Sequence, residues 1–250
     1  MPLRAVLFDI GDTLWAFPGD DRNVAIPHFE RVRMLFSAHA EAPTAQEMLE
    51  ALQRRFARER EESPRRQPPG TQASTWLLAK EAFATLGFEP PDGELREFAA
   101  IAFDFEAELA VSQEPEPEMP QVLTGLRERG LRLAAVSNTF VTTHTLARIF
   151  EARGIVHLID EVVSSADVGF RKPSAHCFLP ALGALAVEPA EAIMVGDRLD
   201  TDIEGALGLG MTAVLTHQYR QEDPGPSPFK PHHVIAHLSD LIPIVESMDR

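Results

Sequence analysis

Short apolar runs that end in polar residues recur along this chain of 250 residues. The first run covers residues 5–8 and stops at Asp9, a pattern typical of a buried strand. After residue 120, similar runs are found at residues 131–136, 159–163, 192–195, 211–216 and 234–235. Between them, apolar residues at helical spacing predict helices at residues 121–129, 143–153, 175–185 (interrupted near Pro180), 203–209 and 238–248. This alternation predicts a parallel sheet wrapped by helices, the doubly wound α/β class.

A different pattern occupies residues 23–109, where no strand-like alternation is found. Apolar residues such as Met48, Leu52 and Phe56 recur there at helical spacing, which predicts four or five helices. Segments rich in proline or other breakers lie on both sides of this region. The sequence therefore predicts a core domain formed by residues 1–16 and 118–250, and an inserted all-helical cap domain of residues 17–117.

Polar side chains stand at or just after the ends of the predicted strands. In a parallel sheet the carboxyl ends of the strands share one edge, where open α/β sheets place their ligands. We therefore expect one group of residues to gather there: Asp9, Ser137, Asn138, Lys172, Asp197 and Asp202.

The chemistry of this group points to a phosphate-handling site. Asp9, Asp197 and Asp202 would repel one another unless a cation lay between them. Carboxylate oxygens suit Mg²⁺, which usually also binds substrate phosphate oxygens. Ser137 and nearby backbone N–H groups can hold the oxygens of an anion, and Lys172 supplies a positive charge. A carboxylate flanked by Mg²⁺ and a lysine is an activated nucleophile for an electrophilic phosphorus.

Net charge, apolar runs and cysteine content limit which partners and which cellular location the protein is expected to have. The net charge of −15 argues against nucleic-acid binding, which relies on Lys and Arg to neutralise phosphates. No apolar run approaches the roughly 18 residues of a membrane span, and no signal peptide is indicated at the N-terminus. The single cysteine, Cys177, fits a reducing compartment. We expect a cytoplasmic protein with no nucleic-acid or membrane partner; the sequence leaves its oligomeric state open.

Four ordered segments resemble the motifs of the haloacid dehalogenase-like (HAD) hydrolase superfamily. They are FDIGDTL at residues 8–14, VSNT at 136–139, RKP at 171–173, and VGD at 195–197 with DIEGA at 202–206. The helical insert between the first two segments resembles the α-helical cap of subfamily I. The resemblance implies a Rossmann-like core and a hydrolase whose cap closes over the site and selects the substrate.

The resemblance also implies a role for each matching residue. Asp9 would be the nucleophile and would form an aspartyl-phosphate. Asp9, Asp197 and the backbone carbonyl of Gly11 would bind Mg²⁺, and Asp202 would orient the metal's ligands.

The remaining matching residues imply a phosphate site. Ser137 and Asn138 would bind the substrate, and Lys172 would hold both the nucleophile and the charge of the phosphoryl group. The expected activity is Mg²⁺-dependent hydrolysis of a small phosphorylated metabolite.

Gly11 departs from the family's phosphatases, which usually carry a second aspartate at that position as general acid and base. Such help is worth about 10²–10⁴-fold in rate. Asp12 could reach the site through a rearranged loop, with Thr13 a further candidate beside it. The general acid could instead come from the cap, as Asp20, Asp21 or a water. A third explanation is that the reaction needs little protonation of the leaving group.

Two other functions remain open from the sequence. A metal-independent 2-haloacid dehalogenase would also lack the second aspartate, although the presence of both Asp197 and Asp202 favours a metal and phosphoryl transfer. A weakly catalytic protein that binds a phosphorylated ligand is the other alternative. The cap contains a run of arginines, namely Arg54, Arg55, Arg58 and Arg60. This run forms either a solvated helix face or the wall of a cleft that attracts an anionic substrate.

Overall fold

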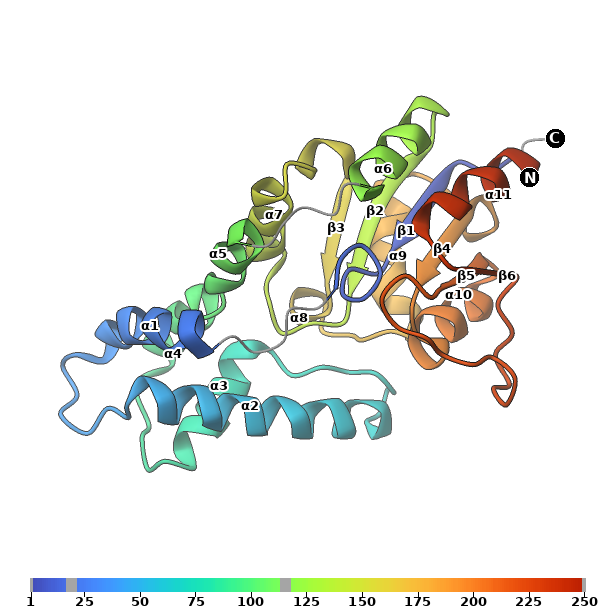
Figure 1. The fold of residues 1–250 in the computed structure, drawn as a ribbon. Helices are drawn as coiled ribbons and strands as arrows, with labels where there is room; N and C mark the ends of the chain where they lie inside the picture. The colour runs from blue at the N-terminus through green and yellow to red at the C-terminus, as the bar shows by residue number, and fades with distance from the viewer. Residues whose placement is uncertain (1, 17–21, 113–117, 249–250) are drawn as a thin grey trace.

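One parallel sheet organises the protein. The computed structural model describes residues 2–16, 22–112 and 118–248. Its sheet has six strands in the order β3-β2-β1-β4-β5-β6, and every neighbouring pair is parallel (Figure 1). The strands are β1 (Ala5–Phe8), β2 (Arg132–Ser137), β3 (Glu161–Ser164), β4 (Ala192–Gly196), β5 (Thr212–Thr216) and β6 (His233–Ile235). The predicted α/β class is confirmed.

Both faces of the sheet are buried, as the continuous apolar run of β1 predicts. Alternate residues of a strand point to opposite faces, so Val6 and Phe8 pack in one hydrophobic cluster while Ala5 and Leu7 pack in another. The first cluster includes residues of α6 (Glu118–Glu128), α7 (Thr143–Ala152) and α11 (Leu241–Met248). The second includes residues of α9 (Ala175–Ala184) and α10 (Glu204–Leu209). Helices therefore cover the sheet on both faces.

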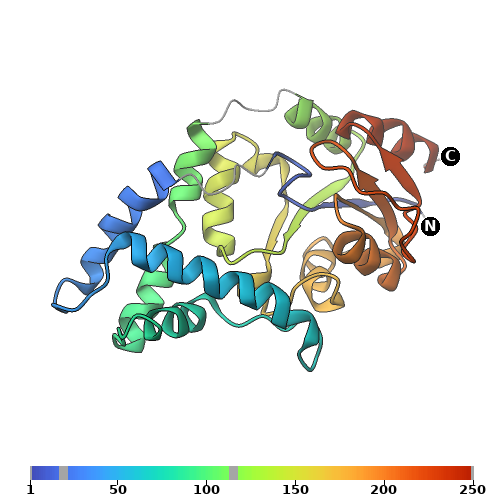
Figure 2. The ribbon, with the colours of Figure 1, turned by 60° about the horizontal axis from the view of Figure 1, so that its bottom comes forward.

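The region between β1 and α6 consists, in its described part, of helices joined by loops. It contains α1 (Arg22–Val32), α2 (Ala45–Glu62), α3 (Thr75–Ala84), α4 (Asp92–Ile101) and α5 (Phe105–Ser112). Thr44 begins α2 with a capping box, in which its side chain accepts from the backbone of Glu47 and the Glu47 side chain accepts from the backbone of Thr44. Figures 1 and 2 both show α1–α4 on one side of the molecule and β4–β6 on the other. The division into core and cap domains stays a prediction.

Local structure differs from the sequence expectation at three places. Helix α6 begins at Glu118, because Pro120 falls in its first turn, where a missing N–H costs no helical bond. Helix α9 continues through Pro180, so the expected interruption is wrong; its apolar face, which carries Phe178 and Leu182, is packed in the core. The short helix α8 (Ser165–Val168) was not predicted, because four residues are too few for a periodic pattern.

No helix in the described residues combines the length and the apolar character needed to cross a membrane.

Candidate active site

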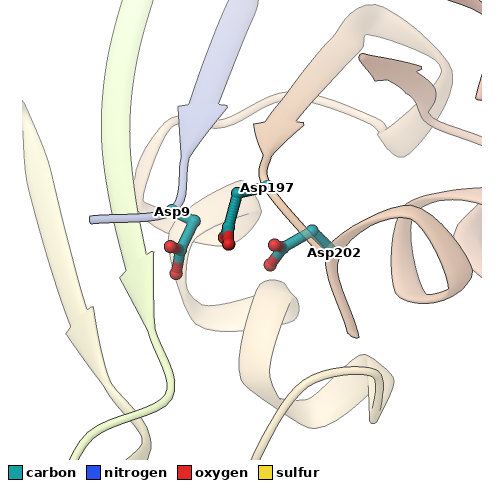
Figure 3. Close-up of side chains that lie close together, drawn as sticks. All are labelled: Asp9, Asp197 and Asp202. Carbon is teal, nitrogen blue, oxygen red and sulfur yellow. The ribbon is translucent and has the colours of Figure 1, made fainter. Parts of the chain in front are cut away.

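Three aspartates meet at the carboxyl edge of the sheet. Asp9 follows β1 and Asp197 follows β4; these strands are neighbours, with Phe8 paired to Val195. Each of Asp9, Asp197 and Asp202 offers a carboxylate oxygen, and these oxygens lie within 4.8 Å of one another. Figure 3 shows the three carboxylates turned toward a shared space. All three residues are buried.

The backbone around Asp202 is shaped to hold its carboxylate. A π-helical turn, Leu199–Ile203, carries Asp202 back toward the end of β4. There the carboxylate accepts from the backbone N–H of Arg198 at 3.1 Å. A Cβ atom at Gly196 would lie 2.3 Å from the Asp202 Cγ atom. Asp202 therefore occupies the space that any side chain at residue 196 would need.

Lys172 lies between two of the aspartates. Its Nζ donates to Asp9 Oδ1 at 2.5 Å and to the Val136 carbonyl at 2.7 Å, and it forms an ion pair with Asp202 Oδ1 at 2.7 Å. Burial alone would lower the pKa of Lys172, but the Asp202 and Asp9 carboxylates outweigh it and raise that pKa. The lysine is therefore fully charged and holds Asp9 in place.

The loop that carries Lys172 is fixed by Asn138. The Lys172 backbone N–H donates to Asn138 Oδ1 at 2.7 Å, and Asn138 Nδ2 donates to the Lys172 carbonyl at 3.0 Å. Asn138 thus ties the end of β2 to the segment before α9. This contact gives Asn138 a positioning role that the sequence did not predict.

The aspartates are packed at an electrostatic cost. Burial, with repulsion from Asp202 and Asp197, raises the pKa of Asp9 to about 7, although Lys172 opposes the shift. Burial and Asp202 raise the pKa of Asp197 to about 6, while Arg220, whose Nη1 is 3.3 Å from Asp197 Oδ2, opposes it. Arg220 was missed from the sequence because it follows the end of β5 by four residues.

The donor set fits a divalent cation. Three carboxylates are paired with two cationic side chains, Lys172 and Arg220, so one negative charge is left over. A divalent cation among the carboxylates would relieve their repulsion. Oxygen donors of this kind suit hard cations.

A cavity of about 940 Å³ opens onto the cluster. It is lined from the core by the predicted site residues Asp9, Gly11, Asp12, Ser137, Asn138, Lys172, Asp197 and Asp202. Residues of the helical region line it from the other side, among them Arg60 of α2 and Phe105 of α5. Thr13 is fully buried and is not part of the lining.

Asp12 adopts an uncommon backbone conformation. Its φ is 55°, in the left-handed region where Asp and Asn are the commonest residues after glycine. Its N–H donates to the Trp15 carbonyl at 2.8 Å, which closes the loop after β1, and Asp12 lines the cavity. The other acids considered from sequence, Asp20 and Asp21, lie outside the described residues.

A family model for haloacid dehalogenase-like hydrolases matches residues 3–210. This chain belongs to that family of hydrolases. It is 30% identical over 226 residues to glyceraldehyde 3-phosphate phosphatase from Methanopyrus kandleri, covering 90% of this chain and 88% of that protein. It is 28% identical over 221 residues to ribulose-1,5-bisphosphate 5-phosphatase from Halopiger xanaduensis, covering 88% and 87%.

Solved structures support the same fold. The 2-haloacid dehalogenase from Pseudomonas syringae pv. Tomato DC3000 matches with a TM-score of 0.62 and 22% identity over 98% of both chains. That likeness concerns the fold alone, because one fold hosts many activities. The predicted superfamily is confirmed.

Proposed function

We propose that this protein is a Mg²⁺-dependent phosphatase that hydrolyses a small phosphorylated metabolite through an aspartyl-phosphate on Asp9. The observation that carries the proposal is the buried cluster of Asp9, Asp197 and Asp202 around Lys172. A dehalogenase that works without metal has no need for an acid cluster with a surplus negative charge. The family relatives named above as phosphatases support the same choice.

The first half of the reaction is the attack of Asp9 on phosphorus. Lys172 holds one oxygen of Asp9, Oδ1, at 2.5 Å, which leaves Oδ2 to form the new O–P bond. The bond from phosphorus to the ester oxygen breaks, and the leaving group departs with a proton. Lys172 and Ser137 hold the oxygens of the phosphoryl group. Mg²⁺ bound by Asp9, Asp197 and the Gly11 carbonyl would offset the negative charge that attacking carboxylate and phosphate bring together.

The second half releases the product. A water attacks the phosphorus of the aspartyl-phosphate, the O–P bond to Asp9 breaks, and inorganic phosphate and the free carboxylate result. Both halves need a proton to move, first to the leaving oxygen and then from the water. Since Asp12 lines the cavity, we assign this proton transfer to Asp12 rather than to a residue of the cap.

We also propose the wider organisation of the enzyme. Residues 1–16 and 118–250 would form the core and residues 17–117 the cap, which supplies part of the cavity wall and excludes water. The net charge of −15 supports an enzyme without a nucleic-acid partner, and the single cysteine, Cys177, supports a cytoplasmic location. We expect no membrane partner.

The test is phosphate release from a panel of phosphomonoesters, with Mg²⁺ and with a chelator. We expect turnover that needs Mg²⁺ and is abolished in Asp9→Asn. Asp223→Asn, an exposed aspartate outside the cavity, is the matched control and should keep wild-type turnover. Absence of phosphate release from every ester, with halide released from 2-haloacids in chelator, would establish the dehalogenase alternative instead.

A further inference from the structure

Two arginines from distant parts of the chain meet at one aromatic ring. Arg60 belongs to α2 of the helical region, and Arg171 directly precedes Lys172. The guanidinium carbon of each lies 5.3 Å from the centroid of the Phe140 ring. The two cationic groups are therefore separated by at most twice that distance. Phe56 stacks on the same ring with centroids 4.1 Å apart, which fixes the ring between α2 and the core.

Neither arginine is held by a carboxylate in the part of the chain that the structure describes, although Glu59 acts on Arg171 from a distance. Within residues 2–16, 22–112 and 118–248, neither forms an ion pair with a carboxylate, whereas Arg55 and Arg66 of the same region pair with the buried Glu59. The partner of Arg171 is the neutral Gln72 Oε1, at 3.0 Å. Burial and the charge of Arg60 lower the pKa of Arg171 to about 10. Arg171 is half-buried and Arg60 is exposed, and an anion between the two guanidinium groups would be attracted by both.

The position of Arg171 is built by contacts across the site. Gln72 is buried; its Oε1 accepts from Ser165 as well as from Arg171, and its Nε2 donates to the Thr139 carbonyl at 2.9 Å. The backbone N–H of Arg171 donates to the Gly70 carbonyl at 2.8 Å. These bonds join the helical region to the core at the point where Arg171 enters the cavity.

Both arginines line the cavity that contains the aspartate cluster. Arg171 is the chain neighbour of Lys172, and neighbouring Cα atoms are about 3.8 Å apart. Lys172 lines the same cavity, so one substrate in that cavity can contact both Lys172 and the arginine pair. Guanidinium groups bind carboxylates and phosphates in a bidentate manner.

We propose that Arg60 and Arg171 form a second anion site, which selects phosphorylated substrates that carry another anionic group, a carboxylate or a second phosphate. This inference rests on the proposed phosphatase function and specifies its substrate class. It also assigns Arg60 to the cleft, where the sequence left open whether the arginine run of α2 is only a solvated face.

The test compares matched esters in two arms. The carboxylate arm measures kcat/KM for 3-phosphoglycerate against glycerol 3-phosphate, and the phosphate arm measures fructose 1,6-bisphosphate against fructose 1-phosphate. We expect wild type to prefer the ester with the second anion in at least one arm. Arg60→Gln and Arg171→Gln should each reduce that preference about tenfold or more, as the loss of a hydrogen bond to a charged group predicts.

Arg58→Gln is the control, because Arg58 is exposed on the same helix and does not line the cavity; it should keep the wild-type preference. Equal kcat/KM in both arms, or a preference that survives Arg60→Gln, would overturn the inference. If no ester is turned over, the phosphatase proposal fails. Calorimetric measurement of the binding of the same pairs of esters then tests whether the anion site exists. Tighter binding of the second-anion ester that is lost in Arg60→Gln supports the site, and equal binding of both esters overturns it.

Discussion

Replacing Gly196 with alanine tests whether Asp202 is locked in place. A Cβ atom there would lie 2.3 Å from Asp202 Cγ, so the carboxylate would have to retreat by about 1 Å to reach ordinary contact. That movement would break its 2.7 Å ion pair with Lys172 and its 3.1 Å bond from the Arg198 N–H. Removing one partner of a buried charge pair costs about 3–5 kcal/mol. We expect Gly196→Ala to lower the free energy of unfolding by this amount.

Urea unfolding of four proteins would measure the effect: wild type, Gly196→Ala, Asp202→Gly and the double variant. The added Cβ would also lie 2.4 Å from Asp202 Cβ, so glycine is the residue that removes every clashing atom. In that background the cost of Gly196→Ala should fall below about 1 kcal/mol. Gly183→Ala, in α9 with nothing within 4 Å of its added Cβ, should be stabilising by up to about 1 kcal/mol. A cost of Gly196→Ala that is under about 0.5 kcal/mol, or equal in both backgrounds, would refute the reasoning.

Three further predictions concern the proton, the lysine and the metal. Asp12→Asn should lower kcat for alkyl phosphates about 10²–10⁴-fold. It should barely slow the first-turnover release of p-nitrophenol from p-nitrophenyl phosphate, because that leaving group needs no proton. Gly11→Asp added to it should recover part of the loss. Lys172→Met should lower the unfolding free energy by about 3–5 kcal/mol, measured in urea, because it leaves the buried carboxylates without their cation. Mg²⁺ at a hundred times its Kd should add about 2.7 kcal/mol to wild-type stability, measured by thermal unfolding. Asp197→Asn should lose that gain; equal losses in the exposed control Asp223→Asn would count against the site.

The sheet and the gathering of polar residues could be predicted because both follow from local pattern. A buried strand such as β1 is a continuous apolar run, and parallel strands place the residues after them on one edge. Asp9 and Asp197 were found in this way.

The contacts that hold the site could not be predicted, because they join residues far apart in the chain. The docking of Asn138 on the Lys172 backbone spans 34 residues, and the π-helical turn before α10 depends on where Asp202 is held. For Arg60, sequence periodicity could not distinguish a solvated face from a cleft wall, since that depends on how Phe140 of the core packs against α2.

The central claim is that Asp9 carries the phosphoryl group. The most direct measurement is mass spectrometry of protein quenched in acid within milliseconds of mixing with substrate and Mg²⁺. We predict that the peptide containing Asp9 gains the mass of one phosphoryl group, and that Asp9→Asn gains none. The account would be contradicted if a substrate-saturated sample released phosphate at the wild-type rate while that peptide carried no phosphoryl group.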